Sequence, residues 1–163
     1  MENKAVSDTG PIIHLSEINL QNALNIFSAI IIPEEVFNEL KKNNSAIPRK
    51  AEVIKLNYKS KGLLKILVYQ NELDMGESAA ISLALQQGIA NFITDDLDAR
   101  IVAKNYGLEV HGTIGIILRA FRERVINKET AIKKIKSLPS ESSLFITQDL
   151  INKIVSSVEE FKK

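Results

Sequence analysis

Short apolar runs alternate with longer amphipathic stretches along this chain, which predicts strands that are each followed by a helix. Several of the short runs have no polar position that could face solvent, as in strands covered by helices on both sides. The runs predicted as strands are 5–6, 29–32, 66–69, 92–93 and 108–110. Strands that alternate with helices predict an open, mostly parallel α/β sheet.

The longer stretches place apolar residues at helical spacing, and several carry end signals. Pro33 suits a first helical position, with Glu34 and Glu35 at the positive end of the helix dipole. Gly107 is predicted to end one helix and Thr113 to cap the next. The predicted helices are one that begins near Pro11, then 33–42, 76–87, 97–105, 114–124, 128–136 and 148–160.

Composition supports one folded domain and excludes several classes of site. The chain has 163 residues, of which 45% are hydrophobic and 25% charged, enough to bury a core. The absence of cysteine excludes disulfides, thiolate zinc sites and cysteine nucleophiles. Without a signal peptide or an apolar run near the ~20 residues that span a bilayer, we expect a cytoplasmic protein with no membrane partner. The predicted division is a domain over 1–126 with a helical extension over 127–163 packed on it.

The net charge of +1 conceals a strong segregation of sign along the chain. Residues 1–40 hold six acids against one lysine, a net of −5, whereas 41–65 hold eight cations against one glutamate, a net of +7. Residues 66–99 hold six acids and no lysine or arginine, and 119–136 hold seven cations against two acids. The basic bands could attract a polyanion. Solvated helix faces are the ordinary alternative.

Aspartates follow two of the predicted strands. Asp8 comes directly after the first apolar strand, and Asp95 holds the equivalent place after 92–93, with Asp96 and Asp98 beside it. In open α/β sheets, ligands bind outside the carboxyl ends of the strands. Concentrated carboxylates are unfavourable unless a cation or a proton neutralises them, so the pattern favours a metal site. The alternative for Asp8 is an ordinary helix N-cap.

Two glutamates extend this acidic set, and each has a structural alternative. Glu77 stands at the start of a small-residue apolar helix face, but its spacing from Asp74 also fits a capping box. Glu39 lies beside the apolar stripe of its helix, four residues from Glu35, and a counterion would relieve that repulsion. Alternatively, Glu39 is an exposed residue paired with Lys42.

The joint pattern is more specific than any single acid. Five motifs follow one another: 7–13 (SDTGPII), 32–40 (IPEEVFNEL), 73–84 (LDMGESAAISLA), 93–100 (ITDDLDAR) and 111–113 (HGT). Their order and spacing over about residues 4–124 resemble those of PIN-domain nucleases. Within that family, they are similar to the small prokaryotic proteins related to VapC-type toxins of toxin–antitoxin pairs.

The resemblance implies a three-layer α/β/α fold with a mostly parallel sheet, and acids that hold one or two Mg²⁺ or Mn²⁺ ions for RNA hydrolysis. Carried over by motif, the catalytic residues are Asp8, Glu39, Glu77, Asp95 and Asp98. The implied metal ligands are Asp8, Glu77, Asp95, Asp96 and Asp98, and the resemblance leaves open which of the last three binds directly. Two positions depart from the family: Gly10, often serine or asparagine, and Glu77, usually aspartate.

The resemblance also suggests partners. RNA would contact Thr9, a hydroxyl residue close to the site, and the basic band at Lys41, Lys42, Arg49 and Lys50. An antitoxin protein and a second copy of the chain are further expected partners, and the helices after Asn127 could cover the sheet, form a dimer surface or receive the antitoxin. We expect a packing role for the apolar stripe over 151–158, a packed or surface position rather than a ligand role for His14, and no role for His111.

Two other functions compete with the nuclease. A PIN fold can persist as a non-catalytic RNA- or protein-binding module, which Mn²⁺ need not stabilise. A phosphatase of the haloacid-dehalogenase type also uses an aspartate after its first strand. That family needs a second acid two residues later, where this chain has Gly10.

Overall fold

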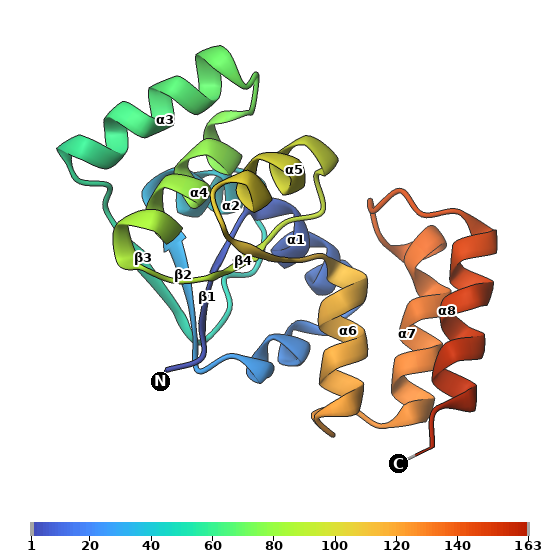
Figure 1. The fold of residues 1–163 in the computed structure, drawn as a ribbon. Coiled ribbons are helices and arrows are strands. Elements are labelled where there is room, and N and C mark those ends of the chain that lie inside the picture. The colour runs from blue at the N-terminus through green and yellow to red at the C-terminus, as the bar shows by residue number, and fades with distance from the viewer. Residues whose placement is uncertain (1, 163) are drawn as a thin grey trace.

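A computed structural model describes residues 2–162, which form a five-stranded, all-parallel sheet flanked by helices (Figure 1). The strand order is β3-β2-β1-β4-β5. The strands are β1 (Lys4–Ser7), β2 (Ala29–Pro33), β3 (Ala51–Ile54), β4 (Asn91–Ile93) and β5 (Glu109–His111). The predicted three-layer α/β/α fold is confirmed.

Helices connect the strands and continue after the last one. α4 packs against β1, β2 and β4, while α1, η1 and α6 pack against one another. The helical elements are α1 (Thr9–Glu17), η1 (Gln21–Ile26), α2 (Glu34–Lys42), α3 (Tyr58–Gln70), α4 (Met75–Gln87), α5 (Leu97–Asn105), α6 (Thr113–Arg122), α7 (Lys128–Glu141) and α8 (Gln148–Glu160). No helix within residues 2–162 is both long and apolar enough to cross a membrane.

The central strands and α4 form the middle of the core. Every residue of β2 is buried, as are Ala5 and Val6 of β1. α4 buries nine consecutive residues from Gly76 to Ala84, most of them small, and Ser82 satisfies its hydroxyl by donating to the Ser78 carbonyl. Small side chains let the helix approach the sheet closely, which fixes its first turn beside the end of β1.

One predicted strand is wrong, and one strand was missed. Residues 66–69 lie inside α3, which begins where the Asn57 side chain accepts a hydrogen bond from the Ser60 amide. A run of four apolar residues fits either a strand or one side of a helix, and here Leu64 and Leu67 are buried at helical spacing while Tyr69 is exposed. The missed strand is β3, one of the two edge strands, which lies in the basic band and is too polar for a buried-strand pattern.

The C-terminal helices α7 and α8 pack on each other, and α7 packs on α6, so the pair lies to one side of the sheet (Figure 1). The predicted packing stripe of α8 is confirmed, since Ile151, Val155 and Val158 are buried. α7 runs further than predicted, to Glu141, with Pro139 in its last turn. The loop between the two helices reaches α1, where both the amide and the hydroxyl of Ser143 donate to Glu17.

Candidate active site

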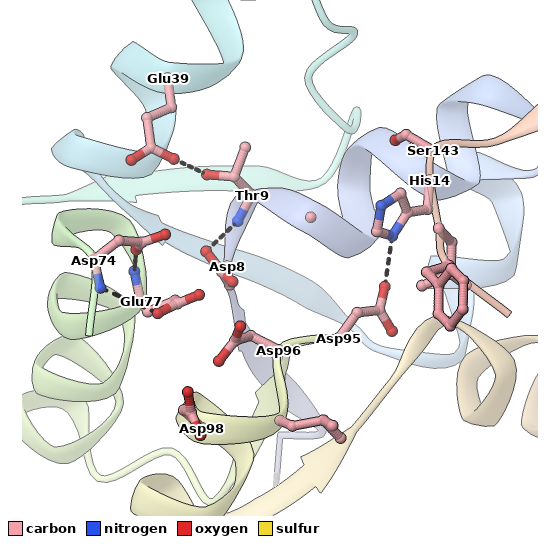
Figure 2. A pocket seen from close by; sticks show the side chains of 14 residues that line it. Asp8, Thr9, His14, Glu39, Asp74, Glu77, Asp95, Asp96, Asp98 and Ser143 are labelled. Carbon is pink, nitrogen blue, oxygen red and sulfur yellow. Dashed lines mark hydrogen bonds and ion pairs between the residues drawn. The ribbon is translucent and has the colours of Figure 1, made fainter. Parts of the chain in front are cut away.

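An acidic pocket of about 710 Å³ opens at the carboxyl ends of β1 and β4. Neither lysine nor arginine lines it, as the charge pattern of the sequence suggested. Seven of the lining side chains are carboxylates: Asp8, Glu39, Asp74, Glu77, Asp95, Asp96 and Asp98 (Figure 2). The fold therefore gathers acids from four separate motifs into one space.

Asp8 is both the N-cap of α1 and a wall of the pocket. Its Oδ1 accepts a hydrogen bond from the Thr9 amide at 2.6 Å, and its Oδ2 accepts one from the Thr94 hydroxyl at 3.1 Å. Burial raises the pKa of Asp8 to about 7; the charges of Asp74 and Glu39 add to the shift, against the two hydrogen bonds. Asp8 is thus the N-cap that the alternative predicted, and its carboxylate also lines the acidic pocket.

Glu77 likewise keeps both of its predicted roles open. The Glu77 amide donates to Asp74 Oδ1 at 2.8 Å, and the Asp74 amide donates to Glu77 Oε2 at 3.2 Å, which completes the capping box of α4. Burial raises the pKa of Glu77 to about 8, with further contributions from the charges of Asp74, Asp8 and Asp96. A carboxyl group at this position takes up a proton near neutral pH unless a cation replaces that proton.

Glu39 reaches the same pocket from α2. Its Oε2 accepts a hydrogen bond from the Thr9 hydroxyl at 2.5 Å. Both carboxylate oxygens lie over the first turn of α4, where a Cβ on Gly76 would stand only 2.8 Å from each. The alternative pairing of Glu39 with Lys42 is not found in the described part of the chain. Thr9 and Gly76 together set the position of Glu39.

Asp95 faces away from the other acids and joins three elements. Its Oδ1 accepts from the Thr113 amide at 2.7 Å, and its Oδ2 accepts from the Thr113 hydroxyl at 2.5 Å and contacts His14 Nδ1 at 2.6 Å. Burial alone would raise the pKa of Asp95, but the hydrogen bonds from His14 and Thr113 lower it below the usual value. Asp95 is therefore a satisfied carboxylate that ties α1 to the start of α6.

Asp96 and Asp98 occupy the other side of this turn. The Asp96 side chain caps α5 through the Ala99 amide at 2.8 Å. In Figure 2 it points toward the space between Asp8 and Glu77, whereas Asp98 lies farther along the helix. Among the three acids that the motif left open, Asp96 thus shares the space of the buried carboxyl groups.

Comparison with known proteins bears on this geometry. A family model described as a PIN domain matches residues 4–160, nearly the whole chain. The chain belongs to the PIN-domain family. Members of this family are generally nucleases and typically use divalent metals. A search of curated proteins found no match.

The acidic pocket of this PIN domain fits a divalent cation with few protein ligands. Within residues 2–162, no three acidic or imidazole side chains approach closely enough to hold a metal ion by themselves. Mg²⁺ is usually bound by one or two carboxylates with waters and substrate phosphate, so a full protein cage is not required. Asp8 and Glu77 would be the candidates for such a pair, because burial and the neighbouring acids raise both of their pKa values and a bound cation would offset the cost of ionising them.

The basic residues predicted to bind RNA lie apart from this pocket. Lys41 and Lys42 occupy the last turn of α2, just beyond Glu39, and the Lys41 ammonium lies 5.3 Å from the Phe37 ring centre. Arg49 and Lys50 precede β3, at the amino-terminal edge of the sheet, where they line a different pocket with residues of η1. None of the four lines the acidic pocket.

The structure adds site residues that the sequence did not assign. His14, expected to be a packed or surface residue, contacts Asp95 across 81 positions of sequence. Thr113 is the first residue of α6 rather than its cap, which is Gly112. The loop between α7 and α8 also lines the pocket, through Ser143, Leu144 and Phe145. No local pattern marks these residues, although the motif 111–113 contained Thr113.

Proposed function

We propose that this PIN domain is a divalent-metal-dependent ribonuclease that hydrolyses RNA phosphodiester bonds. The observation that carries the proposal is that Asp8 and Glu77 are two buried acids lining the same pocket. Both carboxyl groups are buried at the ends of different elements, and both have pKa values raised to about 7 and 8 in a pocket without lysine or arginine. Titratable groups whose pKa values are strongly shifted and that lie in a cleft are candidates for a functional site.

The residues would divide the work according to their contacts. Asp8 and Glu77, with Asp96 facing them, would hold the cation, while Glu39 and Asp98 would act directly or through water. A bound divalent cation supplies neutralisation of charge and Lewis-acid polarisation of the phosphate. Thr9 keeps Glu39 in place by its hydroxyl. Asp95 positions α1 and α6 through His14 and Thr113.

The proposed substrate is RNA. The proposed cellular role of the protein is that of the toxin in a toxin–antitoxin pair. Lys41 and Lys42 lie on the helix that carries Glu39 and would attract the phosphate backbone. Cations that contact phosphates release counterions, so each lost contact lowers the salt dependence of binding by about one unit of slope. The double variant Lys41→Gln/Lys42→Gln should therefore bind RNA more weakly and with a shallower salt dependence. The RNA affinity and salt dependence of this variant are compared with those of Arg49→Gln/Lys50→Gln, which removes two charges at the amino-terminal edge of the sheet, away from the acidic pocket.

Cleavage of RNA tests the proposal. Purified protein is incubated with single-stranded and structured RNA in Mn²⁺, in Mg²⁺ and in a chelator. Wild type should cleave only with metal, and Asp8→Asn should lose that cleavage. Asp149→Asn, an exposed acid at the start of α8, is the matched control and should retain it. Absence of metal-dependent cleavage, or full cleavage by Asp8→Asn, contradicts the proposal.

A non-catalytic binding module is the second candidate, supported by the lack of a three-acid metal group within residues 2–162. Titration with Mn²⁺ separates the two. A ligand that binds only the folded state raises the unfolding temperature by mass action, so a functional metal site gains stability as Mn²⁺ is added. A binding module that needs no cation would bind RNA with the same affinity in chelator, gain no thermal stability from Mn²⁺ and cleave nothing.

A further inference from the structure

A second pocket, of about 500 Å³, adjoins the acidic one and has a different character. The two pockets share Asp95, Leu144 and Phe145, so these residues stand at their common border. Apolar side chains from β5, α6 and α8 line most of the second pocket, and Arg100 is its sole lysine or arginine. We call it the Arg100 pocket. An apolar surface with one cation beside a nuclease site suits a base together with a phosphate.

Arg100 is held in this pocket with donors to spare. Its Nη2 donates to the Thr94 carbonyl at 3.4 Å, a long hydrogen bond, and its buried Nε has no partner. Within residues 2–162, Arg100 forms no ion pair. Gly112 leaves room for the guanidinium, because a Cβ there would stand 2.6 Å from Nη2. A guanidinium with unused donors is a ready site for an anion such as phosphate.

Phe145 stands at the border of the two pockets and is 91% exposed. Its loop is anchored to α1, since the Ser143 amide and hydroxyl donate to the Glu17 carboxylate at 3.0 and 2.7 Å. An exposed aromatic ring on an anchored loop offers a flat surface that one base can stack on. The Phe145 ring therefore lies at the border of the pocket that holds the carboxylates.

We propose that the Arg100 pocket binds the nucleotide next to the scissile phosphate, with Phe145 stacked on its base and Arg100 bound to its phosphate. This inference rests on the proposed ribonuclease function and narrows its substrate to RNA that is unpaired at this position. A base inside a duplex is already stacked on both faces and cannot present one to Phe145. An apolar protein segment over Arg100 would bury the guanidinium charge without a partner, whereas a phosphate would neutralise it, so the pocket favours a nucleotide.

Binding is measured in chelator, so that cleavage does not interfere, with a short single-stranded RNA that carries 2-aminopurine and with a blunt duplex of the same sequence. Phe145→Ala should bind the single strand about 5- to 150-fold more weakly, the effect of losing one stacked base. It should also lose the stacking-dependent quenching of 2-aminopurine and bind the duplex as wild type does. Tyr58→Ala removes an equally exposed aromatic ring from α3 and should change none of these quantities.

Arg100 is tested separately, because its contact with Thr94 also serves the fold. Arg100→Gln should weaken binding of the single strand and reduce its salt slope by about one. Arg100→Lys keeps the charge and should retain most of the slope. Unfolding temperatures of both variants show whether they are folded, and Phe145→Ala, at an exposed position, supplies the result if they are not.

The outcomes separate this inference from the ribonuclease proposal. If wild type cleaves RNA with Mn²⁺ but Phe145→Ala matches it in affinity and quenching, the Arg100 pocket is not the subsite and the nuclease stands. If quenching depends on Phe145 but no RNA is cleaved, the subsite stands and the nuclease is wrong. If wild type binds neither RNA in chelator, the subsite is overturned, a protein ligand becomes the occupant to seek, and the cleavage assay alone decides the nuclease.

Discussion

The carboxylate of Glu39 lies so close to Gly76 that a Cβ at that position would stand 2.8 Å from both of its oxygens. Two elements distant in sequence, α2 and the first turn of α4, thus meet through an acid and a missing side chain. Because Glu39 is also bonded to the Thr9 hydroxyl, Gly76 controls whether that contact can form.

Gly76→Ala should therefore lower RNA cleavage with little effect on stability. The new methyl group pushes the end of the flexible Glu39 side chain away from Thr9, while alanine is favoured over glycine in a helix by about 0.5–1 kcal/mol. Denaturant unfolding and cleavage rates measure the two effects. In a Glu39→Ala background, the same substitution should be stabilising, because nothing remains to be displaced. Equal effects of Gly76→Ala in both backgrounds would contradict the contact.

The raised pKa values of Asp8 and Glu77 predict how the stability of the metal-free protein depends on pH. Above the unfolded value of about 4 and up to the folded values of about 7 and 8, the folded state binds more protons than the unfolded state. The free energy of unfolding should therefore fall as pH rises from about 4 to 8 in chelator. Thermal unfolding across this range measures the slope.

Asp8→Asn removes one of these groups and should flatten that slope. At pH 8 in chelator, it should unfold at a higher temperature than wild type, by about 2–4 °C for each kcal/mol of relieved repulsion. It should also lose most of the stabilisation that Mn²⁺ gives the wild type. Asp149→Asn, with an exposed side chain on α8, controls for the change in net charge. A wild-type curve that is flat between pH 4 and 8 would show that neither acid is perturbed.

Asp95 and Asp96 are neighbours in sequence with opposite predicted sensitivities. Asp95→Asn should lose about 1.5–3 kcal/mol of stability, because its carboxylate accepts from Thr113 twice and contacts half-buried His14. Asp96→Asn should stay within about 0.5 kcal/mol of wild type, since asparagine also caps helices well, yet lose Mn²⁺-dependent cleavage. Urea unfolding and cleavage assays on both variants decide. Equal loss of stability in the two would overturn the assignment.

The lowered pKa of Asp95 predicts that Asp95→Asn and Asp96→Asn differ in how their stability depends on pH. A depressed folded pKa contributes stability above the unfolded value near 4, and this contribution is lost as pH falls through the folded value. Acid unfolding of wild type should thus show a contribution that Asp95→Asn lacks. The Asp96→Asn protein should keep it.

The loop between α7 and α8 should depend on Glu17 for its order. Glu17→Ala removes the acceptor of both Ser143 hydrogen bonds, which are exposed, so global stability should fall by only about 0.5–1 kcal/mol. Local opening should increase more, and limited chymotrypsin digestion should cut after exposed Phe145 faster than in wild type. Phe145→Ala in the same background should abolish that cut. An unchanged cutting rate would mean that Ser143 does not anchor the loop.

The sequence predicted the parallel sheet because its central strands β1, β2 and β4 are largely buried and read as apolar runs. The same rule failed for 66–69, where four apolar residues lie on α3, and for β3, whose edge position leaves it polar. A short run carries too little periodicity to distinguish the two states. The Asn57 cap was the local signal that could have decided it.

Within the site, local patterns identified residues but not their orientation. The strand ends located Asp8 and Asp95, and the capping box was visible at Asp74 and Glu77. Which way Asp95 turns depends on His14, 81 residues away, and on the close approach that Gly112 permits. Contacts between distant segments leave no periodic trace in one sequence, so these assignments required the folded chain.

The Glu77 carboxylate has two roles, because it accepts a hydrogen bond from the Asp74 amide in the capping box of α4 and also lines the acidic pocket. If a cation draws the side chain inward, the Asp74 amide loses its acceptor and its hydrogen becomes free to exchange with solvent. The start of α4 would then report occupancy of the site as a local change in exchange rate, without any movement of the domain as a whole. Hydrogen exchange at the Asp74 amide would then show whether a cation occupies the site.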